Sequence, residues 1–280
     1  MKKIGFVDYY ISEWHANSYP KWIEEAAAKL GVEYKVAYAW AEEYVSPVDG
    51  RNTDEWCRDF GAARCESIEE LCEKSDFVII LAPSNPEKHL EYAERVLRFG
   101  KRTYIDKTFA PDYKTARKIF NLGEKFSAPF FSSSALRYSA ALEGLSDSKY
   151  LTTFGGGSNY EEYIVHQAEM VVSVLKNQPI SLKVEKQGKQ YIASVKLGGG
   201  KEATMIYSPS LSYAVAAEGE DGETAYRTAQ PGHFEKLILD VLTFFESGRV
   251  SFDTQETLCV MKLREAAIKG ASNPGTVVEV

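Results

Sequence analysis

The sequence lacks three features that would place a protein in a class at once. No run of about 18 apolar residues occurs in its 280 residues, so no membrane-spanning helix is expected. Its four cysteines form no C-x-x-C pair, and the sequence therefore predicts neither a zinc site nor a redox dithiol. No basic cluster offsets the net charge of −7, which argues against nucleic acid as a partner.

The first residues also lack the pattern of a secretory signal peptide, because their apolar run is short and soon becomes polar. Residues 4–8 have the character of a first β-strand instead. Since the cysteines show no pairing pattern either, we expect a cytoplasmic protein with reduced thiols.

The first half of the chain alternates between short apolar runs and helical patterns. The run at 76–82 is the clearest, and its continuous apolar character is typical of a parallel strand that is covered on both faces. Such alternation predicts parallel βαβ units with right-handed crossovers. We expect strands at 4–8, 33–40, 76–82, 103–106 and 130–132, and helices at 17–30, 53–60, 67–72, 87–99 and 112–125.

The second half has a different pattern, in which alternating runs are separated by glycine-containing turns. This predicts an antiparallel meander accompanied by helices. The chain is therefore expected to divide into an α/β domain over 1–134 and an α+β domain over 135–280. In the second domain we expect a helix and connector at 140–151, helices at 159–176, 232–247 and 254–269, and strands at 181–185, 191–197, 203–207, 212–217 and 276–280.

A charged pair, Asp106 and Lys107, closes the strand expected at 103–106. Ligands bind at the carboxyl ends of strands in open α/β sheets, and a lysine there can hold a charge or transfer a proton. The alternative is a lysine that reaches from a strand end into solvent. Because adjacent strand residues face opposite sides, we expect Asp106 to point away from Lys107, toward backbone amides.

A histidine with two acidic neighbours lies in the helix expected at 159–176. Glu162 precedes His166 by four residues and Glu169 follows it by three, so one helix face can carry all three. A carboxylate bonded to one imidazole nitrogen fixes the tautomer and leaves the other nitrogen for substrate. The alternative is a chance Glu–His pair on an exposed face. Two ligands are too few to predict a metal site.

Five stretches, taken together and in order, resemble the Gfo/Idh/MocA family of sugar and polyol oxidoreductases. Residues 76–86 resemble its fourth strand, and 106–108 (Asp-Lys-Thr) stand where that family has Glu-Lys-Pro. Residues 136–138 resemble its arginine-bearing segment, 162–169 its acid-x-x-x-His-x-x-acid helix, and 264–278 its usual ending. The resemblance covers nearly the whole chain. It implies a Rossmann-like parallel-sheet domain followed by an α+β domain with a mainly antiparallel sheet.

The first turn departs from that family. A dinucleotide fold normally has Gly-x-Gly-x-x-Gly here, because glycines let backbone amides approach the pyrophosphate. The three glycine positions carry Asp8, Tyr10 and Glu13. Two carboxylates would repel a pyrophosphate at close range, and a tyrosine adds bulk. Either a dinucleotide binds in a shifted pose through the loops at 81–86 and 106–107, or this site has lost it and holds another ligand.

The resemblance implies an NAD- or NADP-dependent oxidoreductase that transfers a hydride between the nicotinamide and a sugar, polyol or related hydroxyl compound. The alternatives are a non-redox relative that binds a sugar-like ligand, and a lyase or hydrolase that uses a retained nicotinamide transiently. The expected partner is a small-molecule substrate, with neither nucleic acid nor membrane. A homo-oligomer, dimer or tetramer, is also implied, since family members commonly pair through the sheet of the second domain.

The same resemblance assigns three roles to individual residues. Lys107 and His166 are expected to face each other across the domain cleft and share acid–base work, with Glu162 as a third catalytic group. Substrate contacts are expected from Arg137, Tyr138, Tyr163, His166 and His15. Cofactor contacts are expected from Asp8, Tyr9, Tyr10, Glu42, Ala82, Pro83, Ser84, Asn85, His89, Asp106 and Lys107.

Overall fold

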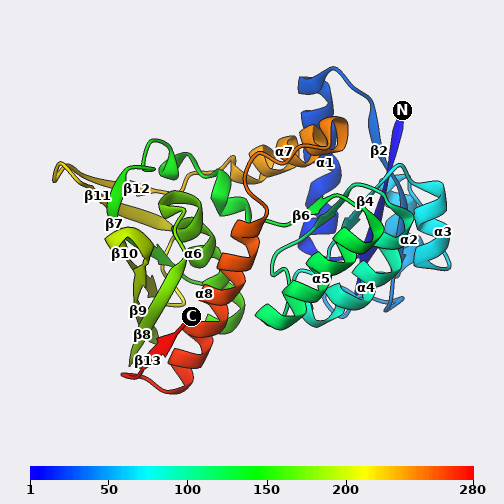
Figure 1. Cartoon of the computed structure of the whole chain (residues 1–280). Coiled ribbons are helices and arrows are strands. Elements are labelled where there is room, and N and C mark those ends of the chain that lie inside the picture. Colours follow the sequence, from blue (N-terminus) through cyan, green and yellow to red (C-terminus); the bar gives the residue numbers. More distant parts are fainter. The chain divides into compact units, whose positions relative to one another are not determined.

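The structure is a computed structural model that describes all 280 residues, and the chain forms two compact units (Figure 1). Unit 1 comprises Met1–Ser133 and Glu235–Asp253, and unit 2 comprises Ser134–Phe234 and Thr254–Val280. Each unit has a β-sheet of its own. The chain thus leaves unit 1 after Ser133 and returns to it once, with a single helix.

Unit 1 is built on a six-stranded sheet with the order β3-β2-β1-β4-β5-β6. All neighbouring strands run parallel, as expected. The order reverses between β1 and β4, and a reversal of this kind opens a crevice at the carboxyl ends of the two strands. The strands are β1 (Lys2–Asp8), β2 (Tyr34–Ala41), β3 (Ala63–Arg64), β4 (Phe77–Ile80), β5 (Thr103–Ile105) and β6 (Phe130–Phe131).

The helices of unit 1 begin and end at residues that satisfy their free backbone groups. Asn52 and Glu55 form a capping box at the start of the second helix, and Gly31 and Gly61 end the first two helices in the left-handed conformation. The helices are α1 (Trp14–Leu30), α2 (Thr53–Phe60), α3 (Ile68–Lys74), α4 (His89–Val96), α5 (Tyr113–Phe126) and α7 (His233–Ser247), with the short helices η1 (Pro86–Lys88) and η2 (Leu97–Phe99) on either side of α4.

Helix α7 belongs to unit 1 over most of its length, which corrects the expected single second domain over 135–280. Phe245 stacks on Phe77 of β4 with ring centroids 4.6 Å apart, and Phe244 meets Phe131 of β6 edge-on at 5.2 Å. Arg102 donates to the carbonyl of Phe245 and so satisfies a free group at the end of the helix. These contacts join residues far apart in sequence, and no local pattern indicates them. The buried face consists of Leu237, Ile238, Val241, Leu242, Phe244 and Phe245.

Unit 2 contains a seven-stranded sheet with the order β12-β11-β7-β10-β9-β8-β13. Only the pair of β10 and β7 is parallel, so the expected mainly antiparallel sheet is confirmed. The strands are β7 (Ser148–Gly155), β8 (Pro179–Gln187), β9 (Gln190–Leu197), β10 (Glu202–Tyr207), β11 (Ala214–Gly219), β12 (Thr224–Thr228) and β13 (Val277–Glu279).

Two of these strands were not expected from the sequence. The helix and connector expected at 140–151 are correct only at the start, because the chain forms the short helix η4 (Ala140–Leu142) and a connector, and then strand β7 from Ser148. In β7 the alternation toward the core is limited to Leu151, Thr153 and Gly155, and a short alternation of this kind resembles a connector. Strand β12 is almost wholly exposed and has no buried face to reveal it.

Helices α6 (Tyr160–Leu175) and α8 (Gln255–Ser272) cover one face of this sheet (Figure 1). Thr153 of β7 donates to Gln167 of α6, which identifies the covered face. Gly270 of α8 allows close approach to the sheet, since a Cβ there would lie 2.7 Å from the Val184 side chain of β8. Within unit 2 the opposite face, which includes Phe154 and Ile206, has no helix over it.

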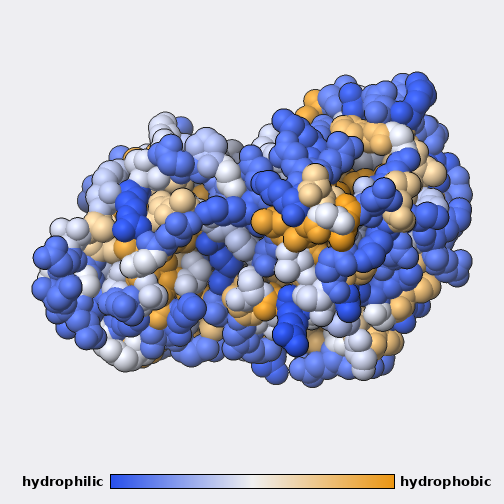
Figure 2. Space-filling view, turned by 90° about the horizontal axis from the view of Figure 1, so that it is seen from above, coloured by the Kyte–Doolittle hydropathy of each residue, from blue (hydrophilic) through white to orange (hydrophobic).

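None of the helices combines the length and the apolar character that a membrane crossing requires. Figure 2 shows a surface on which hydrophilic residues predominate and hydrophobic residues form small groups. Four of the large hydrophobic side chains that remain exposed lie in strands of the unit 2 sheet: Tyr150, Ile180, Tyr226 and Val277. This sheet is therefore one of the places where apolar side chains remain exposed.

A buried hydroxyl without a partner provides a first test of the packing. Tyr160 is 6% exposed, its ring stacks on Tyr191 at 4.2 Å, and its hydroxyl makes no hydrogen bond. Tyr160→Phe keeps the ring and removes the unsatisfied group, so we expect the free energy of unfolding to rise by about 1 kcal/mol. Tyr207→Phe is the matched change, because the hydroxyl of Tyr207 donates to the carbonyl of Gly157 at 2.8 Å. Loss of this hydrogen bond should lower the free energy of unfolding by about 1 kcal/mol. Urea unfolding followed by circular dichroism compares the two, and a loss of stability in Tyr160→Phe contradicts this account.

Candidate functional site

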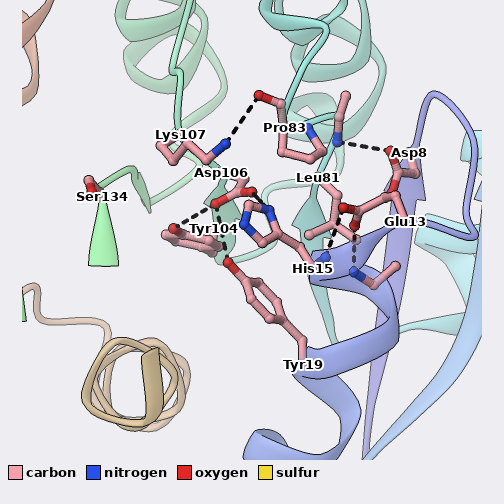
Figure 3. Close-up of polar contacts among 12 residues, drawn as sticks. Asp8, Glu13, His15, Tyr19, Leu81, Pro83, Tyr104, Asp106, Lys107 and Ser134 are labelled. Atoms are coloured by element: carbon pink, nitrogen blue, oxygen red, sulfur yellow. Dashed lines mark hydrogen bonds and ion pairs between the residues drawn. The ribbon is translucent and has the colours of Figure 1, made fainter. Parts of the chain in front are cut away.

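The carboxyl ends of three neighbouring strands bring acidic and basic side chains together in unit 1 (Figure 3). Asp8 is the last residue of β1, Ala82 and Pro83 follow β4, and Asp106 and Lys107 follow β5. Because parallel strands end at the same edge of their sheet, residues distant in sequence converge here. All five were among the residues expected to contact a cofactor.

Asp8 closes the crevice between β1 and β4. Its Oδ1 accepts hydrogen bonds from the backbone N–H of Tyr9 at 2.7 Å and from that of Ala82 at 3.0 Å. The side chain is 1% exposed, and Oδ2 has no hydrogen-bond partner. Burial, together with the negative charge of Glu13, raises the pKa of Asp8 well above its usual range. Asp8 therefore takes up a proton far more readily than an ordinary aspartate.

Glu13 occupies the amino end of α1 with its own carboxylate. It is the N-cap residue, and its side chain accepts hydrogen bonds from the N–H groups of His15, at 2.8 Å, and Ala16. A carboxylate here satisfies free amide donors and interacts favourably with the helix dipole. Burial raises the pKa of Glu13, although the nearby His15 opposes that shift. The position that binds anions in dinucleotide folds is thus filled by a side chain of the protein itself.

Asp106 forms a buried ion pair with His15. Its Oδ2 lies 2.5 Å from Nδ1 of His15, and its Oδ1 accepts from the hydroxyls of Tyr19 at 3.3 Å and Tyr104 at 3.2 Å (Figure 3). Burial alone would raise the pKa of Asp106, but the charges of His15 and Lys107 lower it to about 2. Asp106 also accepts a hydrogen bond from the backbone N–H of Lys107, so the expected contact with a backbone amide is present beside the ion pair with α1.

Lys107 reaches from the end of β5 toward the loop after β4. Its Nζ donates to the carbonyl of Pro83 at 3.4 Å, and the side chain is half-buried. The peptide bond between Lys107 and Thr108 is cis. A half-buried ammonium at the carboxyl end of a sheet can stabilise negative charge that develops on a bound ligand.

His89 connects the two loops and is fully buried. Its Nε2 lies 2.6 Å from the carbonyl of Leu81, and its Nδ1 lies 3.0 Å from that of Phe109. Burial lowers the pKa of His89, although both carbonyls favour the protonated ring. The residue expected near a cofactor therefore fixes the positions of the loops, and both its nitrogens are engaged within the fold.

Glu42 directly follows β2, where a dinucleotide fold places the acid that holds ribose hydroxyls. It accepts hydrogen bonds from Nζ of Lys88 at 2.5 Å and from the hydroxyl of Tyr92 at 2.7 Å. Burial opposes a low pKa for Glu42, but these two donors lower it. Lys88 also lies over the ring of Tyr9, with Nζ 5.4 Å from its centroid. Near these groups, Tyr10 meets Tyr9 edge-on, Asn85 donates to Glu87, and Ser84 is exposed.

The diphosphate of a dinucleotide does not fit this first turn as it is arranged. The amide donors that would bind it, those of Tyr9, His15, Ala16 and Ala82, already donate to Asp8 or Glu13. The two carboxyl groups would also lie beside the phosphate charges in a buried setting, where repulsion is weakly screened. At the loop from Pro83 to Asn85 and at Lys107, no carboxylate occupies the donors in this way. The structure therefore conflicts with a dinucleotide only at the position of its diphosphate.

His166 is the central residue of a second cluster, which lies within unit 2. Its Nδ1 is 2.7 Å from the hydroxyl of Ser134, and Tyr163 and Tyr213 lie beside its ring at centroid distances of 5.8 and 5.6 Å. Ser134 also accepts from the N–H of Leu136, which fixes the hydroxyl. A hydroxyl is thus one group that orients the imidazole.

The glycine loop at 155–157 packs closely against the two tyrosines beside His166. A Cβ on Gly155 would lie 2.4 Å from the Tyr213 ring, and one on Gly157 would lie 2.1 Å from the Tyr163 ring. At Gly156 a Cβ would lie 2.2 Å from the backbone carbonyl of Ser208, which cannot move aside easily. The loop expected at these residues is thus a close-packed support for the two tyrosines.

Arg137, expected at the substrate, is engaged by two carboxylates of unit 2. Its Nε donates to Glu169 and its Nη1 to Glu256, each at 2.6 Å. Burial would lower the pKa of Arg137, but these carboxylates raise it. Tyr138 lies half-buried at the end of the short helix η3 (Ala135–Tyr138). In the first turn of α6, Glu162 accepts from Asn159 at 3.0 Å.

Sequence reasoning missed three contributors: Ser134, Tyr213 and the pairing of His15 with Asp106. Each depends on a contact between distant segments. The only local signal was the triple glycine at 155–157, which indicates close packing as well as a flexible turn. No group of three or more His, Cys, Asp or Glu side chains is arranged to hold a metal ion.

The raised pKa of Asp8 predicts how the stability of unit 1 depends on pH. A carboxyl group whose pKa is raised in the folded state contributes full stability below its ordinary value of 3.8, and this contribution is lost as pH rises through the folded pKa. Asp8→Asn cannot titrate and retains an acceptor for both amides. We expect it to be more stable than the wild type by about 1 kcal/mol or more at pH 7.5, and equal near pH 4.

All four tryptophans lie in unit 1, so their fluorescence during urea unfolding reports on it. Glu24→Gln, at an exposed position on α1 in the same unit, is the control and should change stability little at either pH. An Asp8→Asn variant that is less stable than the wild type at pH 7.5 contradicts the assignment of Asp8 as a strained buried acid.

No protein-family model and no curated protein matches this sequence. Solved structures do match its fold. A putative myo-inositol dehydrogenase from Sinorhizobium meliloti 1021 is 12% identical with a TM-score of 0.79, and all of both chains is covered. Scyllo-inositol dehydrogenase from Lactobacillus casei, solved with NAD(H) and scyllo-inositol, is 11% identical with a TM-score of 0.77, covering 99% of this chain and 98% of the other.

UDP-N-acetylglucosamine 3-dehydrogenase from Acidithiobacillus ferrooxidans is 14% identical with a TM-score of 0.74, and 96% of this chain and 97% of that one are covered. These neighbours are of the kind that the resemblance to the Gfo/Idh/MocA family predicted. The chain has the two-domain fold of inositol and sugar dehydrogenases.

Proposed function

We propose that this protein is an oxidoreductase that transfers a hydride between NAD or NADP and a sugar, polyol or related hydroxyl compound. The observation that carries the proposal is the fold, which matches inositol and sugar dehydrogenases over the whole chain. Two further observations support it: a lysine at the carboxyl end of β5 and a histidine on α6 with aromatic neighbours. The cofactor, when bound, supplies the hydride acceptor or donor.

Lys107 is proposed as the group that acts on the oxygen of the substrate. Its half-buried ammonium sits beside the loop from Pro83 to Asn85, which would hold the nicotinamide end of a cofactor together with Lys107. Oxidation of an alcohol builds negative charge on that oxygen as its proton leaves. A nearby ammonium stabilises this charge and makes the proton easier to remove.

His166 is proposed as the base that accepts the hydroxyl proton. The hydrogen bond between its Nδ1 and Ser134 fixes the ring, and fixed geometry is what general-base catalysis requires. Glu162, one turn earlier on α6, is proposed to favour the protonated ring electrostatically. The rings of Tyr163 and Tyr213 offer apolar faces against which the carbon skeleton of a polyol can pack.

Arg137 and Tyr138 are proposed to shape the substrate region from η3. The ion pairs of Arg137 with Glu169 and Glu256 hold η3 against α6 and α8. Both carboxylates are largely buried, so loss of the arginine would leave them without a counter-charge. Arg137 would thus position the backbone from Ser134 onward, and Ser134 in turn orients His166.

A second function is the binding of a sugar-like ligand without redox turnover. One specific observation favours it: carboxylates already accept from the backbone amides of the first turn. Its distinguishing feature is ligand binding in the absence of any nicotinamide. The third possibility, a lyase or hydrolase with a transient use of nicotinamide, requires the dinucleotide as the main proposal does.

The main proposal predicts the behaviour of two substitutions. Lys107→Met keeps most of the volume of the side chain and removes its charge, so turnover of the polyol substrate should fall by about a thousandfold or more. His166→Asn should reduce it by about a hundredfold or more, through loss of the base. If both residues serve one reaction, the double variant should lose less than the product of the two effects.

The assay screens inositols, sugars and amino sugars with NAD⁺ and NADP⁺, and follows reduced nicotinamide by its absorbance. Lys262→Met, on α8, is the control for loss of a lysine and should retain activity. Near-normal turnover by Lys107→Met would sink its assignment. Absence of any reduction of NAD⁺ or NADP⁺, together with sugar binding by calorimetry, would replace the main proposal with the second function.

We also propose a homo-oligomer that pairs through the open face of the unit 2 sheet. Burial alternates along β7 and β10, and Thr152, Phe154, Thr204 and Ile206 lie on the face without helices. A shallow groove of about 360 Å³ crosses this face between Tyr150 and Val277. Uncovered apolar strand residues of this kind favour association with a second copy.

The mass in solution tests this surface. We expect light scattering to give two or four times the chain mass of 31.3 kDa for the wild type. Ile206→Glu places a charge on the sheet and should shift the mass toward that of one chain. Val48→Glu, an equally apolar exposed residue in unit 1, is the matched control and should leave the assembly intact. A wild-type monomer would overturn the proposal.

Residence in the cytoplasm also remains a proposal. The four cysteines are all free and buried, which supports folding in a reducing compartment.

A further inference from the structure

The first turn of unit 1 holds two carboxyl groups in the place where a dinucleotide fold binds phosphate (Figure 3). Glu13 accepts from two N–H groups at the start of the 17-residue helix α1. Asp8 accepts from the N–H of Tyr9 and, across the crevice, from that of Ala82. The protein therefore occupies its own anion site with its own anions.

One observation that does not depend on the helix end shows that this turn contains an unsatisfied polar atom. Oδ2 of Asp8 has no hydrogen-bond partner, although the side chain is 1% exposed. A buried carboxylate oxygen without a donor is costly, and a proton or a donor group of a ligand would satisfy it. The turn is thus complementary to a proton or a hydrogen-bond donor, and it opposes a second anion.

We propose that Asp8 and Glu13 are specificity-determining residues, which compete with the diphosphate of a dinucleotide so that the diphosphate is bound only together with protons. The inference rests on the proposed use of NAD or NADP. It adds that binding of the diphosphate displaces Glu13 from the amides of α1, and that the displaced carboxyl and its neighbour are then protonated. No bond to the cofactor is formed or broken in this exchange.

The surrounding charges determine the sign of the effect. From α1, His15 faces Glu13, and from the end of β5, Asp106 faces both Glu13 and Asp8. Tyr92 of α4 also interacts electrostatically with Asp8, while its hydroxyl donates to Glu42. Since His15 is paired with Asp106, it offers no net compensation for the charge of a diphosphate. Burial raises the pKa of both Asp8 and Glu13, which makes each easier to protonate than an ordinary carboxyl group.

The test measures binding of NADH by fluorescence between pH 5.5 and 8.5 at constant ionic strength, with no substrate present. For the wild type we expect the Kd to rise with pH by up to about tenfold per pH unit for each proton taken up on binding. Glu13→Gln keeps an acceptor for the amides and removes the charge. At pH 8 it should bind NADH at least about tenfold more tightly than the wild type, with a flatter pH profile.

Three controls identify the origin of the change in NADH affinity. Asp8→Asn should act in the same direction, and His15 is retained in both variants, so loss of His15 is not the cause of the difference. Glu124→Gln, an exposed acid in the last turn of α5, removes the same charge and should behave as the wild type. Reduced nicotinamide riboside, which has no phosphate, should bind equally to all variants.

The inference is overturned if Glu13→Gln and Asp8→Asn bind NADH no more tightly than the wild type at pH 8. A second measurement needs no variant: calorimetric titration of the wild type with NADH at pH 6 in buffers of different ionisation enthalpy. Proton uptake supports the inference, and binding without uptake contradicts it. Tight binding by Glu13→Gln without any turnover would support the inference and reject the proposed redox function, so the two can fail separately.

Discussion

The convergence of buried carboxylates at one edge of a parallel sheet is the constraint on which unit 1 depends. Parallel strands bring Asp8 and Asp106 to the same edge, and α1 adds Glu13. Each carboxylate must find donors or a counter-charge, because an unpaired buried charge is far costlier than a lost hydrogen bond. The fold satisfies Asp106 with His15 and two tyrosines, and Glu13 with the end of α1. Asp8 is only half satisfied.

This constraint connects the architecture to the proposed chemistry. His15 can pair with Asp106 only because α1 starts beside the end of β5, and Ala82 can donate to Asp8 only because β4 neighbours β1. The same strand ends carry Lys107 and the Pro83 loop. The residues that could act on a ligand and those that oppose a diphosphate are therefore held by one set of contacts, and a change in either group alters the other.

Much of the fold can be predicted from local sequence patterns, but the candidate site can be predicted from them only in part. The run at 76–82 and the lysine after the strand at 103–106 were placed correctly, since continuous apolar runs and polar strand ends are visible in the sequence. The return of α7 to unit 1 depends on the fit of Phe244 and Phe245 to aromatic rings of β4 and β6, which no local period encodes. The strand at 148–155 was missed because its alternation is short.

The side-chain partners were harder to predict than the backbone for the same reason. A sequence shows that Asp8 and Glu13 replace glycines, but it does not show that they take the very amides a phosphate would need. Nor does it show that Ser134 contacts His166. In both cases the residue type shows that a charge or a hydrogen-bond donor is present, and the fold determines which group it contacts. The acidic first turn is therefore better understood as an occupied anion site than as a lost one, because its backbone donors are retained and directed at carboxylates.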